Sequence, residues 1–312
     1  MFGSRIADDI ARAAQLACIL EVCTYPKPGN VTRFADFKDT KFEHFLAGSI
    51  AIGPVIWKAA KKGVNVALNK ANLCELQVGR YILSCIVETR RWHRGGNINL
   101  GTVSLLVPIA FGAAISKAED DIVDAKSLRK NIGKVVRSTT VKDAIYYYRA
   151  IKLLGFAGIG KVRDVPSLNV MNPAVERQIR NENVTLYQVM GECSSWDNIC
   201  KEWRTEMNIT FHVGYPTLLQ YYSKTGDVNI SIVHCFLNIL ANYPDTFIAR
   251  KNGYQTAEKV SEKAKIILEK GGMLTRKGKE ALEKFDLELR TEDNRLNPGT
   301  TADLTASSIM VA

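Results

Sequence analysis

The sequence lacks the patterns that mark several common protein classes. Its 7 cysteines include no Cys-x-x-Cys pair, so their spacing indicates neither a zinc site nor a disulfide framework, and we expect reduced, mostly buried thiols. The N-terminus carries Asp8 and Asp9 ahead of its apolar stretch, unlike a signal peptide, which favours a cytoplasmic location. No segment alternates apolar and polar residues over the length of a strand.

Histidines and mixed basic-aromatic runs are also sparse. The 4 histidines form no nucleophile arrangement of the Ser-His-Asp or Cys-His type, and only His44, near Asp36 and Asp39, is a site candidate. Residues 90–94 form one short cluster of arginines around an aromatic ring, which is too little to predict a nucleic-acid partner. The 42 Lys and Arg against 32 Asp and Glu instead favour a partner that carries nucleotide or coenzyme phosphates.

What the chain has in abundance is apolar residues at helical spacing. With 312 residues and 46% hydrophobic content it can bury a sizeable core. The window 98–115 is long enough to suggest a membrane span, but Asn99 and Pro108 inside it favour a buried core helix, and we expect no membrane partner. We predict an all-α protein, a single large multi-helix domain over 1–312. The helices are expected at 4–24, 41–62, 71–92, 98–116, 125–137, 140–154, 173–181, 185–192, 196–207, 214–224, 228–241, 254–270, 275–286 and 300–311.

The segment Tyr25–Arg33 is a stiff, basic turn that directly follows an apolar helical run. Two prolines flank Lys27 and restrict the backbone, and a glycine then allows a sharp turn. Cations beside paired carboxylates suit a metal-bound polyphosphate. A plain turn between two helices is the alternative. The donors and carboxylates of this region are Lys27, Asn30, Arg33, Asp36 and Asp39.

Four further segments concentrate glycine, proline and polar residues. Arg94–Gly101 could bind a phosphate at a helix start, or simply cap that helix. Gly155–Asp164 resembles a phosphate-binding loop but has no Gly-Lys-Ser/Thr ending, so a lid and a connector both remain open. In Asn242–Arg250, Asp245 could cap a helix or bind a cation. Leu296–Leu304 forms a second proline-glycine corner at a helix start.

Taken in chain order, these segments resemble the triphosphoribosyl-dephospho-coenzyme A synthase family. The resemblance spans nearly the whole chain. It implies an all-helical enzyme that transfers the 5-triphosphoribosyl group of ATP to the 2′-hydroxyl of 3′-dephospho-coenzyme A and releases adenine, with Mg²⁺ on the triphosphate. The residues that carry it are Glu21, Pro26–Val31, Arg33, Asp36, Phe42–Leu46, Gly95–Gly101, Pro244–Thr246, Arg250 and Asn297–Leu304.

The resemblance and the chemistry of the reaction together imply roles for individual residues. A carboxylate is needed near the attacking hydroxyl, and further carboxylates are needed to hold the metal. The catalytic candidates are Asp36, Asp39 and Asp245, and the metal candidates are Asp36, Asp39, Asp245 and Asp303. The candidates for binding the nucleotide are Lys27, Gly29, Asn30, Arg33, Gly96, Asn97, Asn99, Arg250, Gly299 and Thr300.

Two departures from the family pattern leave the acceptor open. The chain has Asn99-Leu100-Gly101 where familiar bacterial members carry a Thr-His-Lys-Gly run, and Gly155–Asp164 lacks the paired glutamates of the family. A related nucleotide acceptor therefore stays an alternative to dephospho-coenzyme A. A Mg²⁺-dependent nucleotide hydrolase or phosphotransferase, and a non-catalytic helical protein that binds a nucleotide or RNA, are the other functions considered. The candidate assembly is a homodimer.

Overall fold

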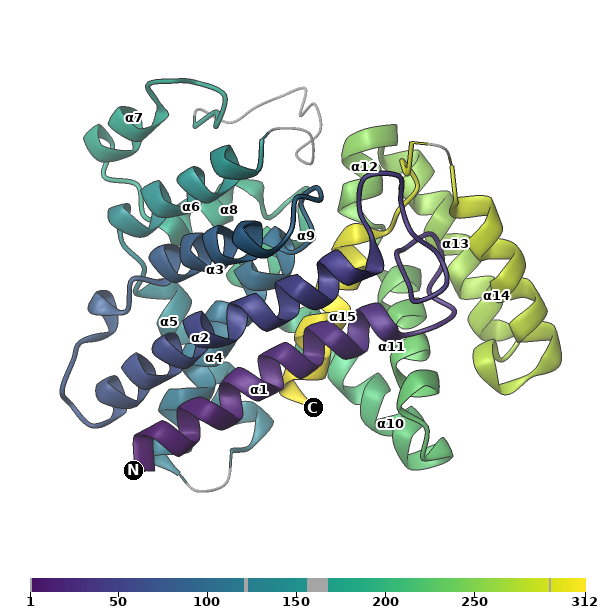
Figure 1. The fold of residues 1–312 in the computed structure, drawn as a ribbon, viewed down its shortest axis with the longest axis horizontal. Helices are drawn as coiled ribbons and strands as arrows, with labels where there is room; N and C mark the ends of the chain where they lie inside the picture. Colours follow the sequence, from purple (N-terminus) through teal and green to yellow (C-terminus); the bar gives the residue numbers. More distant parts are fainter. Residues whose placement is uncertain (1, 121–122, 156–167, 292) are drawn as a thin grey trace.

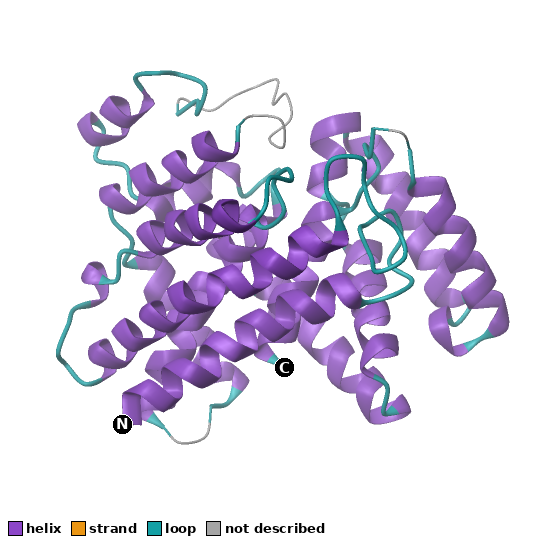
Figure 2. Ribbon diagram, in the orientation of Figure 1, coloured by secondary structure: helices purple, strands orange, loops and turns teal. Residues whose placement is uncertain are grey.

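The computed structural model describes residues 2–120, 123–155, 168–291 and 293–312. Over these ranges the chain forms α-helices joined by loops, with short 3₁₀ and π turns, and contains no strand (Figure 2). Within these ranges, Thr32 and Ala35 form an isolated antiparallel β-bridge. The predicted all-α fold class is confirmed. Most of Gly155–Asp164 lies outside the described residues, so the predicted loop there is not discussed further.

Four long helices build the first part of the molecule. They are α1 (Phe2–Cys23), α2 (Phe42–Ala67), α3 (Val78–Trp92) and α4 (Leu100–Glu119). In Figure 1, α1 and α2 run side by side across the molecule, and α4 lies behind them. Among the described helices, α4 alone is long and apolar enough to cross a bilayer, and 78% of its most apolar window is buried inside the protein.

Five shorter helices pack at one end of this group. They are α5 (Ala125–Arg137), α6 (Val141–Leu154), α7 (Val175–Asn181), α8 (Leu186–Cys193) and α9 (Asn198–Arg204). Side-chain oxygens of Asp124, Thr140, Thr185 and Asp197 accept backbone N–H groups at the starts of α5, α6, α8 and α9. Such caps fix where each helix begins, because the first N–H groups of a helix have no partner within it.

The C-terminal part adds six helices. They are α10 (Tyr215–Thr225), α11 (Val228–Asn242), α12 (Thr246–Asn252), α13 (Tyr254–Glu269), α14 (Arg276–Leu289) and α15 (Gly299–Val311). The last helix returns to the middle of the molecule, where it packs against α1, α4, α11 and α12 (Figure 1). Residues near both ends of the sequence therefore lie together.

Two differences from the predicted elements have clear local causes. We expected no separate helix at α12, because its 7 residues span less than two turns and Pro244 just before it indicated only the end of the preceding helix. The helix expected from residue 71 begins at Val78, because Leu73–Glu75 form a 3₁₀ turn and Gln77 has a left-handed φ of 60° that interrupts the helix.

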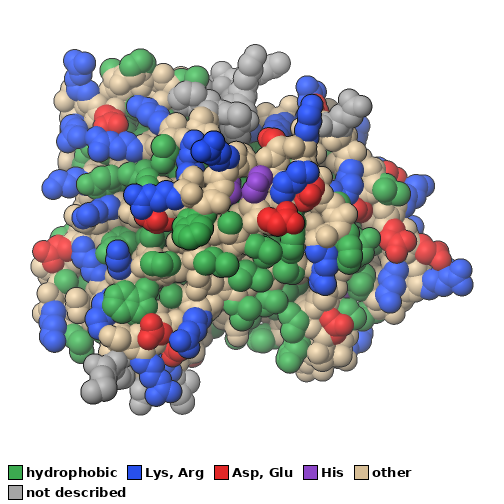
Figure 3. All heavy atoms as spheres, in the orientation of Figure 1, with side chains coloured by type: hydrophobic (Ala, Val, Ile, Leu, Met, Phe, Trp, Pro, Cys, Tyr) green, Lys and Arg blue, Asp and Glu red, His purple; other side chains and the backbone are tan. Residues whose placement is uncertain are grey.

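The buried apolar residues form two clusters. The larger cluster centres on α1, α2 and α4 and extends into the shorter helices, and the smaller joins α11, α13 and α14. Helix α15 comes last in the sequence and packs against helices of both clusters, α1 and α4 of the larger and α11 of the smaller. On the face drawn in Figure 3, Lys and Arg side chains are scattered among acids rather than gathered into one basic patch.

Candidate active site

A cavity of about 870 Å³ lies where α1, α4, α6, α8, α9, α12 and α15 meet. Its size is within the range of small-molecule binding sites. One group of lining residues is polar and the other is apolar or aromatic. The polar group comprises Glu21, Asn30, Ser49, Asn97, Asn99, Thr102, Asn169, Glu192, Asp197, Arg250, Asn297, Thr300 and Asp303. The apolar group includes Phe45, Tyr147, Ile151, Leu168, Val189, Trp196, Ile199 and Phe247.

Lys27, the cation of the Tyr25–Arg33 turn, points into the protein rather than into solvent. It is 1% exposed, and its Nζ donates to the Glu21 backbone carbonyl at 2.9 Å and contacts the Glu21 carboxylate. Burial raises the pKa of Glu21 and lowers the pKa of Lys27, and the contact between the two opposes both shifts. Glu21 lines the cavity, whereas Lys27 lies outside the lining and contacts Glu21.

The rest of this turn is tied to the C-terminal part of the chain. The Gly29 N–H donates to Asp286 at 2.8 Å, and the φ of Gly29 is 70°, a value that favours glycine. Asn30 lines the cavity and donates from Nδ2 to the Pro298 carbonyl at 3.2 Å. Arg33 is exposed and donates to the Cys23 carbonyl, and it does not line the cavity. Of the three predicted donors, the structure brings Asn30 to the cavity.

Asp303 is a cavity carboxylate that Thr102 and Gly101 approach closely. Thr102 donates its hydroxyl to Oδ1, and a Cβ on Gly101 would lie 2.6 Å from the carboxyl carbon, so glycine is required for this approach. Burial, the nearby Glu21 and the nearby Asp245 raise the pKa of Asp303 to about 7, although the Thr102 hydrogen bond lowers it. A carboxyl group with this pKa can exchange a proton near neutral pH.

Asp245 is instead saturated by donors from the protein. Its Oδ1 accepts the Phe247 and Ile248 N–H groups at 2.9 and 3.0 Å, which caps α12. Its Oδ2 accepts the backbone N–H and the hydroxyl of Thr301 at 2.7 and 2.8 Å. Asp245 is 0% exposed and does not line the cavity. Of the two readings that the sequence left open, the structure shows the cap. The catalytic and metal roles predicted for Asp245 stay predictions.

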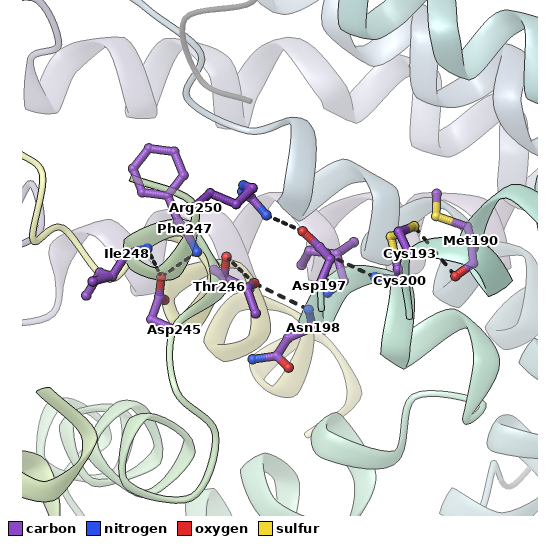
Figure 4. A network of polar contacts seen from close by, with 12 residues as sticks. Met190, Cys193, Asp197, Asn198, Cys200, Asp245, Thr246, Phe247, Ile248 and Arg250 are labelled. Atoms are coloured by element: carbon purple, nitrogen blue, oxygen red, sulfur yellow. Dashed lines mark hydrogen bonds and ion pairs between the residues drawn. A yellow bond between two sulfur atoms is a disulfide. The ribbon is translucent and has the colours of Figure 1, made fainter. Parts of the chain in front are cut away.

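Arg250 links the α12 region to α9 through Asp197 (Figure 4). One of its terminal nitrogens contacts Asp197 Oδ2, while Asp197 Oδ1 accepts the Ile199 and Cys200 N–H groups at 2.8 and 3.2 Å. Both Arg250 and Asp197 line the cavity. Among the described residues, Arg250 Nε and Asn297 Oδ1 find no hydrogen-bond partner although they are buried, which is typical of a site that lacks its ligand.

Asp36 and Asp39 lie outside the cavity lining and are exposed. Asp36 accepts the Phe42 N–H at 2.8 Å and pairs with Lys41 at 3.5 Å, so it supports the start of α2. His44 Nδ1 accepts the Lys41 N–H at 3.1 Å and its ring stacks on His93. The structure does not bring Asp36 or Asp39 to Asp303, and their catalytic and metal roles stay predictions.

The two segments that could bind a phosphate at a helix start, Arg94–Gly101 and Leu296–Leu304, are placed differently relative to the cavity. Asn97 and Asn99 line the cavity just before α4. Asn97 Oδ1 accepts the Leu100 N–H at 3.2 Å, a contact that stabilises the start of this helix. Gly96 lies outside this lining, near Thr40 and Asp39. Gly299 and Thr300 line the cavity in the first turn of α15, where the positive end of the helix favours an anion.

The expectation that all cysteines are reduced is wrong in the structure. Cys193 at the end of α8 and Cys200 in α9 form a disulfide with a Cα–Cα distance of 5.6 Å. The loop between the two helices turns the chain so that residues 7 apart in sequence face each other. No recognised cysteine spacing indicates this pair, because the approach depends on how two short helices pack.

Several cavity residues were absent from the predicted set, and some had a usable signal. Glu21 is an acid within the apolar run of α1, a position where a carboxylate needs a partner or a function. Asp197 follows Trp196 at a helix start, which predicts a cap but not the contact with Arg250. Tyr147 has no sequence signal, because it reaches the cavity through the packing of α6.

The cavity residues offer oxygen atoms suited to Mg²⁺. Among the described residues, no group of three or more His, Cys, Asp or Glu side chains could hold a metal ion by itself. Mg²⁺ is usually held by one or two carboxylates together with substrate phosphates. Glu21 provides a carboxylate, while Asn30 and Asn99 use their amide nitrogens on Pro298 and Thr89 and leave their oxygens available. These residues fit a metal that arrives with a polyphosphate.

Comparison with known proteins shows which family has this sequence pattern. Residues 7–312 match the model of the family described as ATP:dephospho-CoA triphosphoribosyl transferase. A Klebsiella pneumoniae protein named 2-(5''-triphosphoribosyl)-3'-dephosphocoenzyme-A synthase is 34% identical over 305 residues, which cover 96% of this chain and 89% of that protein. An Escherichia fergusonii protein of the same name is 22% identical over 302 residues, which cover 96% and 89% of the two chains.

A solved structure shares the fold. The crystal structure of an Archaeoglobus fulgidus protein, assigned in its description to the triphosphoribosyl-dephospho-coA synthases, superposes with a TM-score of 0.61 at 23% identity. The match covers 86% of this chain and 97% of that one. Because the family model matches almost the entire sequence, and a relative above 30% identity is matched over nearly its full length, the chain belongs to the ATP:dephospho-CoA triphosphoribosyl transferase family.

Proposed function

We propose that this protein transfers the triphosphoribosyl group of ATP to the 2′-hydroxyl of 3′-dephospho-coenzyme A, with release of adenine. Family membership supports the reaction class. The observation that carries the proposal is Asp303, a carboxyl group with a pKa of about 7 that lines the cavity beside the start of α15. The positive end of that helix is suited to phosphates.

Asp303 would take the proton of the attacking hydroxyl. The hydroxyl oxygen forms a bond to C1′ of the ATP ribose, the C1′–N9 bond breaks, and adenine leaves with that electron pair and takes up a proton from water. A base with a pKa near the working pH is efficient in such a step, because it is partly deprotonated yet still holds a proton well. The carboxylate also favours the positive charge that develops at C1′, as carboxylates do in glycoside hydrolysis.

The charge of the cavity explains why the triphosphate would need Mg²⁺. Among the described residues of its lining, Arg250 is the single Lys or Arg, whereas Glu21, Glu192, Asp197 and Asp303 are acids. A triphosphate entering this cavity meets net repulsion unless a divalent cation offsets it. Glu21, Asn30 and Asn99 would hold Mg²⁺, which when bound neutralises phosphate charge and draws the triphosphate toward this wall.

Other cavity residues would position the two substrates. Arg250 is held by Asp197 and can donate to a phosphate oxygen. Gly299 and Thr300 present the start of α15 to the same group. Tyr147, Trp196 and Phe247 provide aromatic surfaces on which adenine can stack. A cytoplasmic location and a homodimer remain predictions from the sequence.

Product analysis tests this proposal directly. The protein is incubated with ATP, Mg²⁺ and 3′-dephospho-coenzyme A, and all products are identified by mass. We expect free adenine and an adduct that contains both coenzyme and triphosphoribosyl groups, in equal amounts. Release of ADP or inorganic phosphate without adenine would show a hydrolase or phosphotransferase and would contradict the proposal. ATP left unchanged in the presence of both Mg²⁺ and acceptor would contradict it as well.

A further inference from the structure

The Cys193–Cys200 disulfide forms part of the wall of the candidate active site. Both cysteines line the cavity of about 870 Å³ that also contains Asp303 and Arg250. Cys193 is partly buried, whereas Cys200 is 7% exposed, so Cys193 is the more accessible of the two to a molecule in the cavity. A disulfide that a ligand can reach is open to attack by a thiol, unlike one enclosed in a core.

Several side chains near the disulfide are apolar and suit an uncharged, flexible group. Val189 lies in the same helix as Cys193, one turn earlier, Trp196 lies in the loop after it, and Ile199 lies in the first turn of α9. These side chains line the cavity with Ile151 and Leu168. Of the charged cavity residues, Glu192 directly precedes Cys193 in α8, whereas Asp197 and Arg250 lie toward α12 in Figure 4, with the disulfide at the opposite end of the drawn network.

The acceptor that we propose brings a thiol of its own. Dephospho-coenzyme A has at one end an adenosine with the attacking 2′-hydroxyl, then a diphosphate, and at the other end an uncharged pantetheine arm that ends in a thiol. An acceptor whose phosphates lie near Arg250 could extend this arm along the apolar wall toward Cys193. The inference below rests on the proposed function, because it requires this class of acceptor.

The other cysteines cannot take part in such an exchange. Cys18 also lines the cavity, but it is a free thiol, and burial raises its pKa so that it stays protonated and unreactive. Cys85 and Cys235 are buried and free, and Cys23 is free and partly buried outside the cavity lining. Cys74 is exposed and free, away from the cavity lining, so it serves as a control. In the described part of the chain, the disulfide is thus the oxidised sulfur pair that the cavity reaches.

We propose that the Cys193–Cys200 disulfide is a thiol-exchange site for the pantetheine thiol of the acceptor. The deprotonated substrate sulfur attacks Cys193 Sγ and forms a mixed disulfide. The Cys193–Cys200 bond breaks, and Cys200 leaves as a thiolate that accepts the proton lost by the substrate thiol. One disulfide replaces another, so the step needs no external oxidant. Attack by Cys200 on the mixed disulfide reverses it and frees the acceptor.

The rate of disulfide opening tests whether binding directs this exchange. Oxidised protein is treated with dephospho-coenzyme A without ATP, or with N-acetylcysteamine, which has the same thiol end but no phosphates. N-ethylmaleimide traps each released thiol, and mass spectrometry identifies the product. At about 10 μM thiol, binding should raise the local thiol concentration to about 1 mM and make opening about 100-fold faster with dephospho-coenzyme A. Equal rates for the two thiols would overturn the inference.

Peptide mapping and variants locate the exchange. We expect the coenzyme on Cys193 and the maleimide on Cys200. The C193S variant should form no adduct at the rapid rate, whereas C74S should behave as the unchanged protein does. A rapid adduct on Cys18 or Cys74 instead would contradict the inference. So would a protein purified without a reductant in which, after unfolding, Cys193 and Cys200 react with maleimide before any thiol is added.

Adenine release, measured on the same preparation, separates this inference from the proposed function. A protein that releases adenine with dephospho-coenzyme A but opens at equal rates with both thiols would retain the proposed function and lose the exchange site. A protein that opens faster with dephospho-coenzyme A but releases no adenine with ATP and Mg²⁺ would bind the coenzyme and lose the proposed reaction.

Discussion

Two aspartates at the start of α12 and in α15 show how differently one fold can use the same side chain. Asp245 accepts four hydrogen bonds from Phe247, Ile248 and Thr301 and is fully buried. Asp303 accepts a hydrogen bond from Thr102, lines the cavity, and has a pKa raised to about 7. The first carboxylate joins α12 to α15, and the second is available to a substrate.

This difference shows that burial alone does not identify a catalytic carboxylate. Burial raises the pKa of both groups, but around Asp245 the surrounding N–H and hydroxyl donors oppose that shift. A carboxylate saturated with donors has no free oxygen for a proton or a metal. The pKa of both carboxyl groups is raised, but Asp303 faces the cavity and can act as a base, whereas Asp245 lies outside the lining and provides rigidity.

The largest expected effect is the loss of catalysis in Asp303→Asn. The amide cannot accept the proton of the attacking hydroxyl, so adenine release should fall by roughly 10²- to 10⁴-fold. The variant should stay folded, because an amide can still accept the Thr102 hydrogen bond. Adenine release per folded molecule measures the loss, and circular dichroism checks folding. Near-normal adenine release from the folded variant would refute the role of Asp303.

Asp245→Asn should affect stability rather than chemistry. The amide NH₂ would oppose donors that now face a carboxylate oxygen, so the free energy of unfolding should fall by about 3 kcal/mol. Below the melting temperature, adenine release per folded molecule should stay within about threefold of the unchanged protein, because Asp245 lies outside the cavity lining. Urea unfolding and adenine assays measure the two quantities. Unchanged stability with abolished activity would reverse the roles of the two aspartates.

Gly101→Ala should disturb Asp303 without removing it. The new methyl group would overlap the Asp303 carboxylate and displace it from Thr102. We expect adenine release to fall about 10- to 100-fold, since a shift of about 1 Å at a reacting group can cost that much. Gly191→Ala in α8 is the matched control, because its nearest heavy atom would be the flexible Arg204 side chain at 3.4 Å. Equal activities of the two variants would contradict this account.

The change in stability that Asp303→Asn causes should depend on pH, because the variant removes a carboxyl group that titrates differently in the folded and unfolded chains. The folded protein holds a proton on Asp303 up to a pKa of about 7, whereas the unfolded chain loses it near 3.8. Folding is therefore penalised as pH rises from about 4 to 7, and the penalty is complete above that window. Replacing the carboxyl by an amide should raise the melting temperature at pH 8 but not at pH 4. A lower melting temperature at pH 8 would contradict the assigned pKa.

Asp36→Asn should have the smallest effect. Asp36 is exposed, and its hydrogen bond to the Phe42 N–H stabilises the start of α2 by about 1 kcal/mol at most. Adenine release should stay within about twofold of the unchanged protein. Loss of activity with retained folding would restore Asp36 as a catalytic or metal residue, as the sequence pattern first suggested.

Much of the fold follows from the sequence because helical periodicity is a local property. The long helices and the caps at Asp124, Thr140 and Thr185 need no knowledge of tertiary contacts. Helix α12 was not predicted, because its 7 residues give little room for a helical pattern of apolar residues after the helix-ending Pro244. The start of α3 depends on the left-handed Gln77, which no local pattern indicates.

The candidate site is only partly predictable, for a physical reason. Proline and glycine corners mark Asn30, Asn99, Gly299 and Thr300, and all four line the cavity. Local patterns do not show which way a charged side chain points. Lys27 lies in a proline-rich turn, where a cation is expected to face solvent. It is instead 1% exposed and pairs with Glu21. The disulfide likewise depends on the packing of α8 against α9.

The pH dependence of kcat/KM for the acceptor, at saturating ATP and Mg²⁺, tests the role of Asp303 most directly. This quantity reports the essential ionisations of the enzyme before the acceptor binds. As pH rises from 5.5 to 8.5, roughly the range in which such a base would titrate, adenine release should increase and level off, with an apparent pKa of about 7. A profile that is flat across this range, or that falls as pH rises through 7, would contradict a catalytic base at Asp303.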